Sequence, residues 1–258
     1  MEIKYEVTEK LNFSLDNTKI TGIATTNKAE TIEVLSLENS DKVELYINNI
    51  KQTAEEKEKI KREISVISEL NQLPFLRTIE DYMNYIIKKD LLNIKNPSKK
   101  KEDSLRIVGL ETTYLNRELI TLSSSEKFLV QVAIALLSNP NILIFVNSFT
   151  YIDLQQEKRL MQLLLRLKEQ FHKTIVIIDD NCDKLYRHTN KMIFIKNNEV
   201  ILEAPTTEAY TRVDFLSKHR FSVPSIIKLT YLARKNKGTK IIYHKDIRDL
   251  IKDIYKHV

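Results

Sequence analysis

The stretch from Leu122 to Asp153 constrains the fold most, because it specifies a capped helix, a stop signal and a buried strand in that order. It opens with residues at the spacing of a helix capping box, Ser123, Ser124, Ser125 and Glu126. The helix should be buried around most of its surface, since Val130 to Leu137 is almost entirely apolar, and Asn139-Pro140 should end it. The apolar run Ile142 to Val146 predicts a central strand covered on both faces.

Length and composition favour a single folded unit of cytosolic type. With 258 residues and 42% hydrophobic content, the chain can form one large α/β domain or a domain with a small appendage. The lone Cys182 excludes an internal disulfide framework, and no run of about 18 apolar residues predicts a membrane-spanning helix. The first ten residues alternate in charge and do not predict a signal peptide. We therefore expect an intracellular protein whose membrane contact, if it has one, is through a partner.

The formal net charge of +6 raises the question of nucleic-acid binding. The densest basic run is Lys99 to Lys101, within the loop-like stretch 93–103, which we predict to be a flexible connector. Aromatic residues are not interleaved with the basic ones, as a surface that stacks bases would require. A solvated, lysine-rich surface is the preferred interpretation, and nucleic acid is not an expected partner.

A second informative segment runs from Gly22 to Ala29, between a predicted strand at 19–24 and a predicted helix at 30–37. Compared with the phosphate-loop pattern G-x-x-x-x-G-K-[ST], Gly22 and Lys28 are in place, but Asn27 replaces the second glycine and Ala29 the hydroxyl residue. In such a loop, backbone N–H groups cradle phosphate, the lysine neutralises it and the hydroxyl holds magnesium. Ala29 cannot hold a metal.

The residues between Gly22 and Lys28 are also poorly suited to such a loop. The chain has only three glycines, Gly22, Gly109 and Gly238. Forcing the β-branched Thr25 or Thr26 to positive φ would cost on the order of 1–3 kcal/mol. The alternative interpretation is an ordinary strand-to-helix turn that contains a surface lysine.

Taken in order, these segments resemble an ATP-binding cassette (ABC) ATPase. The 32 residues from Leu122 to Asp153 match the family's signature helix, turn, strand and following loop without a gap. The resemblance implies an α/β, P-loop NTPase-like fold with a mainly parallel central sheet, an N-terminal antiparallel β part and a helical subdomain at about 75–138. It implies an ABC domain over 1–215 and a C-terminal helical extension over 216–258.

The last 43 residues resemble the tail of energy-coupling factor transporter ATPases, through FSVPSIIKLTYLARKNKG and DIRDLIKDIYKHV. We predict two amphipathic helices with apolar faces, one made by Ile226, Ile227, Tyr231 and Leu232 and the other by Ile247, Leu250, Ile251 and Ile254. The resemblance implies docking on the same tail of a second ATPase subunit. Packing against the chain's own domain is the alternative.

The resemblance also identifies site positions, several of which carry a different residue here. Val146 stands where the family has the magnesium-coordinating Asp, and Asn147 where it has the catalytic Glu. Asp180 replaces the switch His, and Glu69 replaces a Gln that senses magnesium. The retained parts are Lys28 of the phosphate loop, Ser123 of the signature and the dimer-loop Asp153, whereas Ser124 and Ser125 replace two signature glycines. Tyr5 is either an adenine-stacking residue or an ordinary strand tyrosine.

These residues predict a nucleotide-binding-domain-like subunit of an ABC transporter of the energy-coupling factor type. We expect no hydrolysis in its own site, weak binding of ATP and no magnesium. The expected partners are a transmembrane subunit and a second, competent ATPase, favouring a heterodimer at the inner face of the cell membrane. Two alternatives stay open: a non-transport adaptor that keeps the fold without nucleotide, and an active ATPase that uses Asp179 or Asp180 as a substitute acid.

Overall fold

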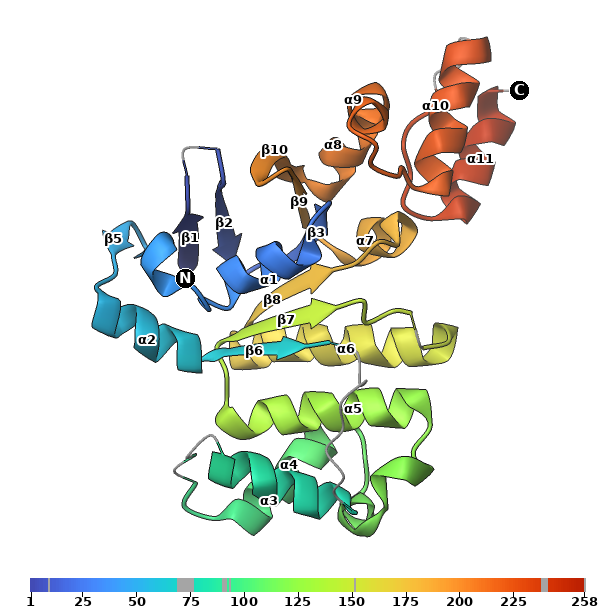
Figure 1. The fold of residues 1–258 in the computed structure, drawn as a ribbon. Helices are drawn as coiled ribbons and strands as arrows, with labels where there is room; N and C mark the ends of the chain where they lie inside the picture. Colours follow the sequence, from blue (N-terminus) through green and yellow to red (C-terminus); the bar gives the residue numbers. More distant parts are fainter. Residues whose placement is uncertain are drawn as a thin grey trace. The chain divides into compact units, whose positions relative to one another are not determined.

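The computed structural model describes residues 1–8, 10–68, 77–89, 92, 94–150, 152–237 and 241–257, and for 236, 237 and 257 the backbone only. The chain divides into two compact units, of which the first comprises residues 1–54 and 176–258 and the second residues 55–175. In Figure 1 the first unit is blue and orange to red, and the second runs from cyan to yellow. The predicted boundaries at 75–138 and 215/216 stay predictions.

The N-terminal part of the first unit is an antiparallel sheet, as the sequence predicted. Its strands lie in the order β2-β1-β4-β5 and comprise β1 (Glu2–Glu6), β2 (Asn12–Asp16), β4 (Glu44–Ile47) and β5 (Ile50–Lys51). Alternate apolar side chains of β1 and β2 are buried, which is the pattern of a sheet with one covered face. Tyr5 is fully buried and stacks on Phe13 at 5.3 Å between ring centroids. The adenine-stacking alternative for Tyr5 is therefore wrong.

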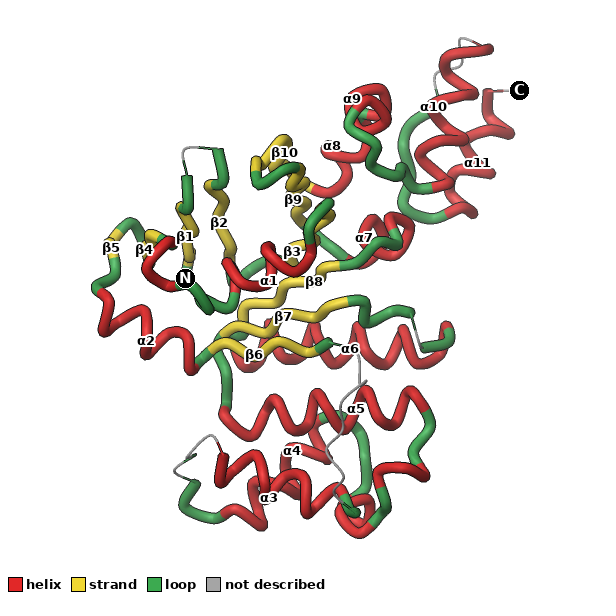
Figure 2. The backbone as a smooth tube through the Cα atoms, viewed as in Figure 1, coloured by secondary structure: helices red, strands yellow, loops and turns green. Residues whose placement is uncertain are grey.

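A second sheet of the first unit contains strands in the order β10-β9-β3-β8. These strands are β3 (Ile20–Thr25), β8 (Thr174–Ile178, of which the last three residues belong to this unit), β9 (Lys191–Lys196) and β10 (Glu199–Pro205). β3 and β9 are parallel. β9 and β10 form an antiparallel hairpin (Figure 2). Asn197 and Asn198 have φ of 49° and 61°, so asparagine takes the left-handed turn where glycine is common.

The described residues of the first unit also form the helices α1 (Lys28–Leu35), α7 (Cys182–His188), α8 (Thr206–Thr211), α9 (Val213–Lys218), α10 (Ser225–Lys237) and α11 (Ile247–His257), together with a 3-10 turn at Ser40–Lys42. The two C-terminal helices bury Ile227 of α10 and Leu250 of α11 within their own unit. Ile247, Ile251 and Tyr255 are 51%, 45% and 79% exposed. The single apolar face predicted for 247–254 is thus divided between an inner and an outer side of α11.

The second unit contains β6 (Ile64–Ile67) paired in parallel with β7 (Ile142–Val146), beside the first two residues of β8. All five residues of β7 are buried, as predicted for a central strand. Its helices are α2 (Ala54–Arg62), α3 (Ile79–Lys89), α4 (Pro97–Ile107), α5 (Ser124–Ala135) and α6 (Leu154–Phe171), with 3-10 turns at Thr112–Asn116, Leu119–Thr121 and Leu136–Ser138. α6 buries a stripe of four leucines at helical spacing: Leu160, Leu163, Leu164 and Leu167.

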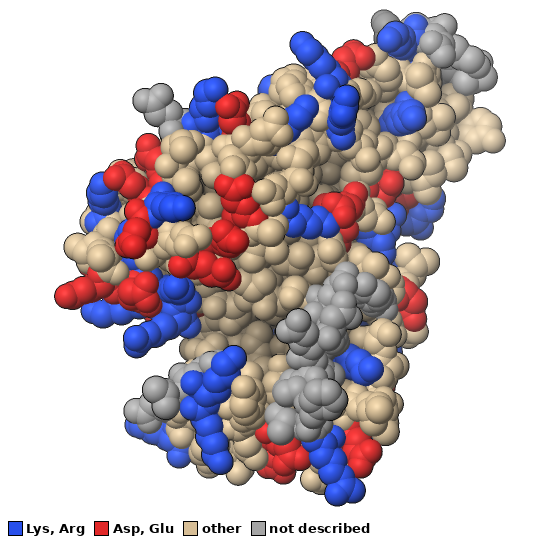
Figure 3. All heavy atoms as spheres, in the orientation of Figure 1, with Lys and Arg blue, Asp and Glu red and all other residues tan. Residues whose placement is uncertain are grey.

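The predicted flexible connector at 93–103 is wrong, because α4 begins there. Asn96 caps the helix by accepting a hydrogen bond from Lys99 N at 3.1 Å, and Pro97 occupies the first helical turn, where its missing N–H is harmless. Lys101 is 3% exposed and its Nζ pairs with Glu80 and with Asn84. Part of the basic run is therefore structural. On the face seen in Figure 3, basic and acidic side chains are interspersed.

Candidate functional site

Gly22 lies inside β3 and not in a loop, so its role differs from the predicted one. A Cβ at this position would lie 2.5 Å from the Met192 sulfur and 2.8 Å from Thr189 Cγ2. Glycine is therefore required by close packing of β3 against Met192 of β9 and against Thr189, which precedes β9. The φ of Gly22 is not positive, and the structure gives no evidence that its backbone faces a ligand.

The connection between β3 and α1 is also shorter than a phosphate loop. Pairing with β9 extends to Thr25, opposite Ile195, and the Thr26 N–H donates to Ile195 O at 3.1 Å. Only Thr26 and Asn27 separate the strand from the helix. None of these loop residues has a positive φ, so the strain predicted for Thr25 and Thr26 is absent. The backbone avoids it by continuing the strand.

Asn27 closes the N-terminus of α1. Its Oδ1 accepts from Glu30 N at 3.3 Å, and its carbonyl accepts from Thr31 N at 3.2 Å. Its Nδ2 donates to Glu30 Oε2 at 2.9 Å, and Asn198 Nδ2 from the β9–β10 turn donates to the other oxygen, Glu30 Oε1. The carboxylate of Glu30 is therefore held at the positive end of the helix dipole, where an anion is stabilised.

Lys28 and Asp180, two of the predicted site residues, are brought together in the first unit. Lys28 Nζ forms an ion pair with Asp180 Oδ2, and their side chains are 25% and 78% exposed. Asp180 follows β8, in the position where the resemblance implies a switch histidine. The neighbouring Asp179 is buried and its Oδ1 accepts from Asn181 N at 2.8 Å. The lysine that the phosphate-loop pattern predicts to bind phosphate is thus paired with a carboxylate of the same chain.

A pocket of about 180 Å³ lies beside this ion pair, within the first unit. Its polar lining includes Thr25, Thr26, Asp179, Asp180, Tyr210, Arg220 and Ser222. The hydroxyl of Tyr210 is buried without a hydrogen-bond partner among the described residues, and burial raises its pKa. Cys182 also lines the pocket, and burial, assisted by the charge of Asp183, raises its pKa to about 11. Its thiol is therefore protonated at neutral pH.

The predicted magnesium positions offer no metal ligand. The side chains of Ala29 and Val146 contain no oxygen, and Val146 is a buried end residue of β7. Asn147 follows it with a left-handed φ of 52°. Within the described ranges, no group of three or more His, Cys, Asp or Glu residues is placed to hold a metal ion. Magnesium chemistry does not fit these residues; Glu69 lies outside the described residues.

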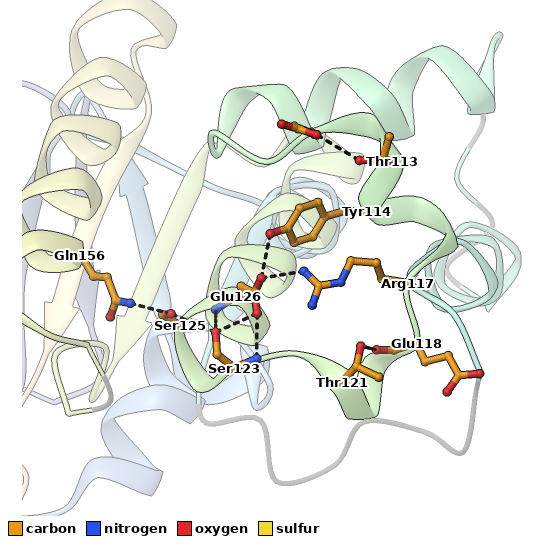
Figure 4. A network of polar contacts seen from close by, with 10 residues as sticks. Thr113, Tyr114, Arg117, Glu118, Thr121, Ser123, Ser125, Glu126 and Gln156 are labelled. Atoms are coloured by element: carbon orange, nitrogen blue, oxygen red, sulfur yellow. Dashed lines mark hydrogen bonds and ion pairs between the residues drawn. The ribbon is translucent and has the colours of Figure 1, made fainter.

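The second unit places the signature residues at the N-terminus of α5, with the predicted capping box present (Figure 4). Ser123 N donates to Glu126 Oε2 at 2.8 Å, while Ser123 Oγ accepts from Glu126 N at 3.3 Å. The other oxygen of Glu126 accepts from Tyr114 Oη and from Arg117 Nη1, both at 2.7 Å. These bonds, led by that from the Ser123 backbone, lower the pKa of Glu126 to about 2.

The two remaining signature serines differ in their surroundings. Ser125 Oγ accepts from Gln156 Nε2 of α6 at 2.7 Å, whereas Ser124 is exposed. Asp153, the predicted dimer-loop residue, caps α6: its Oδ1 accepts from Gln155 N and Gln156 N, both at 2.8 Å. Ser125 and Asp153 therefore make contacts within the chain, whereas the side chain of Ser124 is exposed to solvent.

Sequence reasoning missed the partners that complete both helix ends. Tyr114 and Arg117 precede Glu126 by 12 and 9 residues, a spacing that corresponds to no local motif. Asn198 is 168 residues from Glu30. The only available signals were the acidic residue in the first turn of each helix and the asparagine pair in the β9–β10 turn.

Two solved structures have the same fold as this chain. The structure of cbiO1 from Clostridium perfringens, part of the ABC transporter complex cbiONQ, matches 89% of this chain and 98% of its own, with a TM-score of 0.69 and 17% identity. The ATP-binding cassette MJ0796, in a dimeric post-hydrolysis state bound to ADP and Pi, matches 79% of this chain and 98% of its own, with a TM-score of 0.64 and 22% identity. The fold is that of an ABC cassette, as the sequence predicted.

Curated proteins with similar sequences were also found. The energy-coupling factor transporter ATP-binding protein EcfA2 of Mycoplasma mobile is 27% identical over 212 residues, which cover 78% of this chain and 68% of the relative. The EcfA2 of Mycoplasma capricolum is 26% identical over 203 residues, covering 78% and 69%. No protein-family model matches the sequence. The chain has the fold of an ABC cassette and is similar in sequence to energy-coupling factor transporter ATP-binding proteins. None of its described helices is long and apolar enough to cross a membrane.

Proposed function

We propose that this protein is a nucleotide-binding-domain subunit of an energy-coupling factor type transporter that hydrolyses no ATP in its own site. In this proposal it pairs with a different, competent ATPase subunit and with a transmembrane subunit, at the inner face of the cell membrane. The fold and the related transporter proteins support the transporter assignment. The lack of hydrolysis is inferred from the site residues.

The ion pair between Lys28 and Asp180 is the observation that carries the proposal. A competent site needs the lysine for phosphate and oxygen ligands for magnesium. Here the lysine is paired with a carboxylate, and Ala29 and Val146 provide no oxygen. The resemblance places the catalytic carboxylate at the position of Asn147, whose amide cannot act as a general base. Together these residues support a subunit that assists hydrolysis elsewhere.

The signature end of α5 supports a role toward a partner's nucleotide. Ser124 in the first helical turn is exposed, so its hydroxyl is accessible to a partner's nucleotide, while the positive end of the helix dipole is already balanced by Glu126.

The outward residues Ile247, Ile251 and Tyr255 recur at intervals of four along α11 and form an apolar stripe. A second ATPase subunit that covers this stripe would remove it from water.

The proposal is tested by comparing the isolated chain with a complex purified from its own cells through a tag. We expect no ATP turnover by the chain alone, and co-purification of a transmembrane subunit and an ATPase with an intact phosphate loop. In that complex, Ser124→Arg should lower ATP turnover about tenfold or more, equivalent to about 1.4 kcal/mol. Ser98→Arg is the matched control, because Ser98 is also an exposed serine in the first turn of a helix.

Turnover by the isolated chain that disappears with Lys28→Ala would contradict the proposal and favour the active-ATPase alternative. A second candidate, an adaptor without a nucleotide role, is favoured by one observation: Glu126 already occupies the N–H and hydroxyl of Ser123. For an adaptor, Ser124→Arg would leave the turnover of the complex unchanged, and the co-purifying partner would contain no ATPase.

A further inference from the structure

The end of α1 already contains the groups that would satisfy a bound phosphate. A phosphate at such a site takes two things: a cation, and the positive end of a helix. The cation Lys28 is paired with Asp180, and the helix end carries the carboxylate of Glu30, held by Asn27 and Asn198. Two carboxylates of the chain thus take the place of a phosphate: Asp180 pairs with the cation, and Glu30 lies at the positive end of the helix.

These contacts come from three separate segments of the first unit. Lys28 and Glu30 belong to the first turn of α1, Asp180 follows β8, and Asn198 belongs to the β9–β10 turn. Glu30 has a hydrogen bond to each carboxylate oxygen, which fixes its position near the helix end. An incoming phosphate would have to displace Asp180 from Lys28 and approach past Glu30.

The charge balance of the region points the same way. Among the charged residues of this region, Lys28 and Arg220 are basic, whereas Glu30, Asp179 and Asp180 are acidic. Acidic residues therefore outnumber basic ones among these five. Because like charges repel, a nucleotide phosphate would be disfavoured here relative to a site in which only the lysine is charged.

We propose that Asp180 and Glu30 are specificity-determining residues that exclude a nucleotide phosphate from this loop, Asp180 by occupying Lys28 and Glu30 by occupying the end of α1. The inference deepens the proposed function and rests on it. The loss of magnesium ligands would weaken only metal-dependent binding. Asp180 and Glu30 act on the phosphate itself, so they exclude it in the absence of metal as well. Neutralising Asp180 should therefore create phosphate binding even though no magnesium ligand is restored.

Both charges can be removed by substitutions that should leave the fold intact. The side chain of Asp180 is 78% exposed, and an exposed ion pair contributes little to folding, so Asp180→Asn should fold normally. Glu30→Gln keeps a hydrogen-bonding amide at the helix end while removing its charge. The matched control is Glu208→Gln, which removes the same charge from another ion pair of the first unit, that with Arg212, whose side chains are 54% and 51% exposed.

The measurement is the dissociation constant of ATP in EDTA, followed by calorimetry and by a fluorescent ATP analogue, with inorganic phosphate as a second probe. Asp180→Asn should bind ATP about tenfold more tightly than the unmodified chain, and adding Glu30→Gln should increase the gain. Adding Lys28→Ala to Asp180→Asn should abolish the gain, because the freed cation is its source. Glu208→Gln should bind as the unmodified chain does.

Unchanged affinity in both Asp180→Asn and the double variant, with unaltered circular dichroism and melting temperature, would overturn the inference. A gain that persists after Lys28→Ala would also overturn it, since the effect would then be general electrostatics. ATP turnover is measured on the same samples with magnesium present. Turnover by the unmodified chain would contradict the proposed function, whereas unchanged binding in the variants contradicts only the exclusion by Asp180 and Glu30.

Discussion

The N-termini of α1 and α5 are the two helix ends that the resemblance to ABC ATPases would place near phosphate, and each contains a glutamate in its first turn. At α5, Glu126 accepts a backbone hydrogen bond and contacts with Tyr114 and Arg117, all from one stretch of the chain. At α1, Glu30 is held by two asparagine amides, one of them 168 residues away, and the cation is paired separately with Asp180.

The difference shows two ways in which a helix end can be satisfied. The α5 end is a charge-assisted local network that lowers the pKa of its carboxylate to about 2, so it contributes to stability. The α1 end combines neutral amide contacts with an exposed ion pair, which contribute less. We infer that the α5 network serves the fold, while the α1 contacts mainly decide which ligands are excluded.

The largest expected effect follows removal of the α5 carboxylate. Glu126→Ala should lower the free energy of unfolding by about 2–3 kcal/mol, because it removes the capping box and leaves Arg117 and Tyr114 without their acceptor. Denaturant unfolding followed by circular dichroism measures this change. Glu102→Gln, which breaks an exposed pair with Arg106, should cost less than about 0.5 kcal/mol. Equal effects of the two changes would contradict the comparison.

The pH dependence of stability provides a second test of the contribution of Glu126. The folded-state pKa of Glu126 is lowered from 4.5 to about 2, so its stabilisation is fully present above pH 4.5 and is lost as pH falls toward 2. After allowance for solvent screening, this contribution amounts to about 1–2 kcal/mol. The difference in unfolding free energy between the unmodified chain and Glu126→Gln should therefore be constant from pH 5 to 7 and shrink below pH 4.5. A difference that persists to pH 2 would exclude the carboxylate as its source.

The smallest effect is expected at α1. Asn27→Ala removes the helix cap and one amide contact to Glu30 and should cost about 1 kcal/mol. Asn27→Asp keeps the cap acceptor but places a second carboxylate beside Glu30, so it should restore only part of the loss. Thermal unfolding of the two variants measures both values. A loss at Asn27 larger than that at Glu126 would reverse the proposed division between a structural and a ligand-excluding helix end.

Much of the fold could be predicted because local patterns carry it. The apolar run of β7, the leucine stripe of α6 and the capping box of α5 each depend on residues a few positions apart. The connector that became α4 was predicted wrongly, because asparagine, proline and lysine are typical of loops as well as of helix starts. The folded helix α4 is stabilised by contacts of Lys101 with Glu80 and Asn84 of α3, which are distant in the sequence.

The sequence by itself determined the order of elements, the strand and helix patterns and the identity of the residues that lack metal-binding oxygens. Tertiary structure alone decided that Gly22 is a packing residue, that the strand continues past Thr25 and that Lys28 meets Asp180, which lies 152 residues further along the chain. The physical reason is the separation along the sequence over which each kind of interaction acts. Periodicity and capping act within a few residues, whereas ion pairs and strand contacts depend on which distant segments the folded chain brings together.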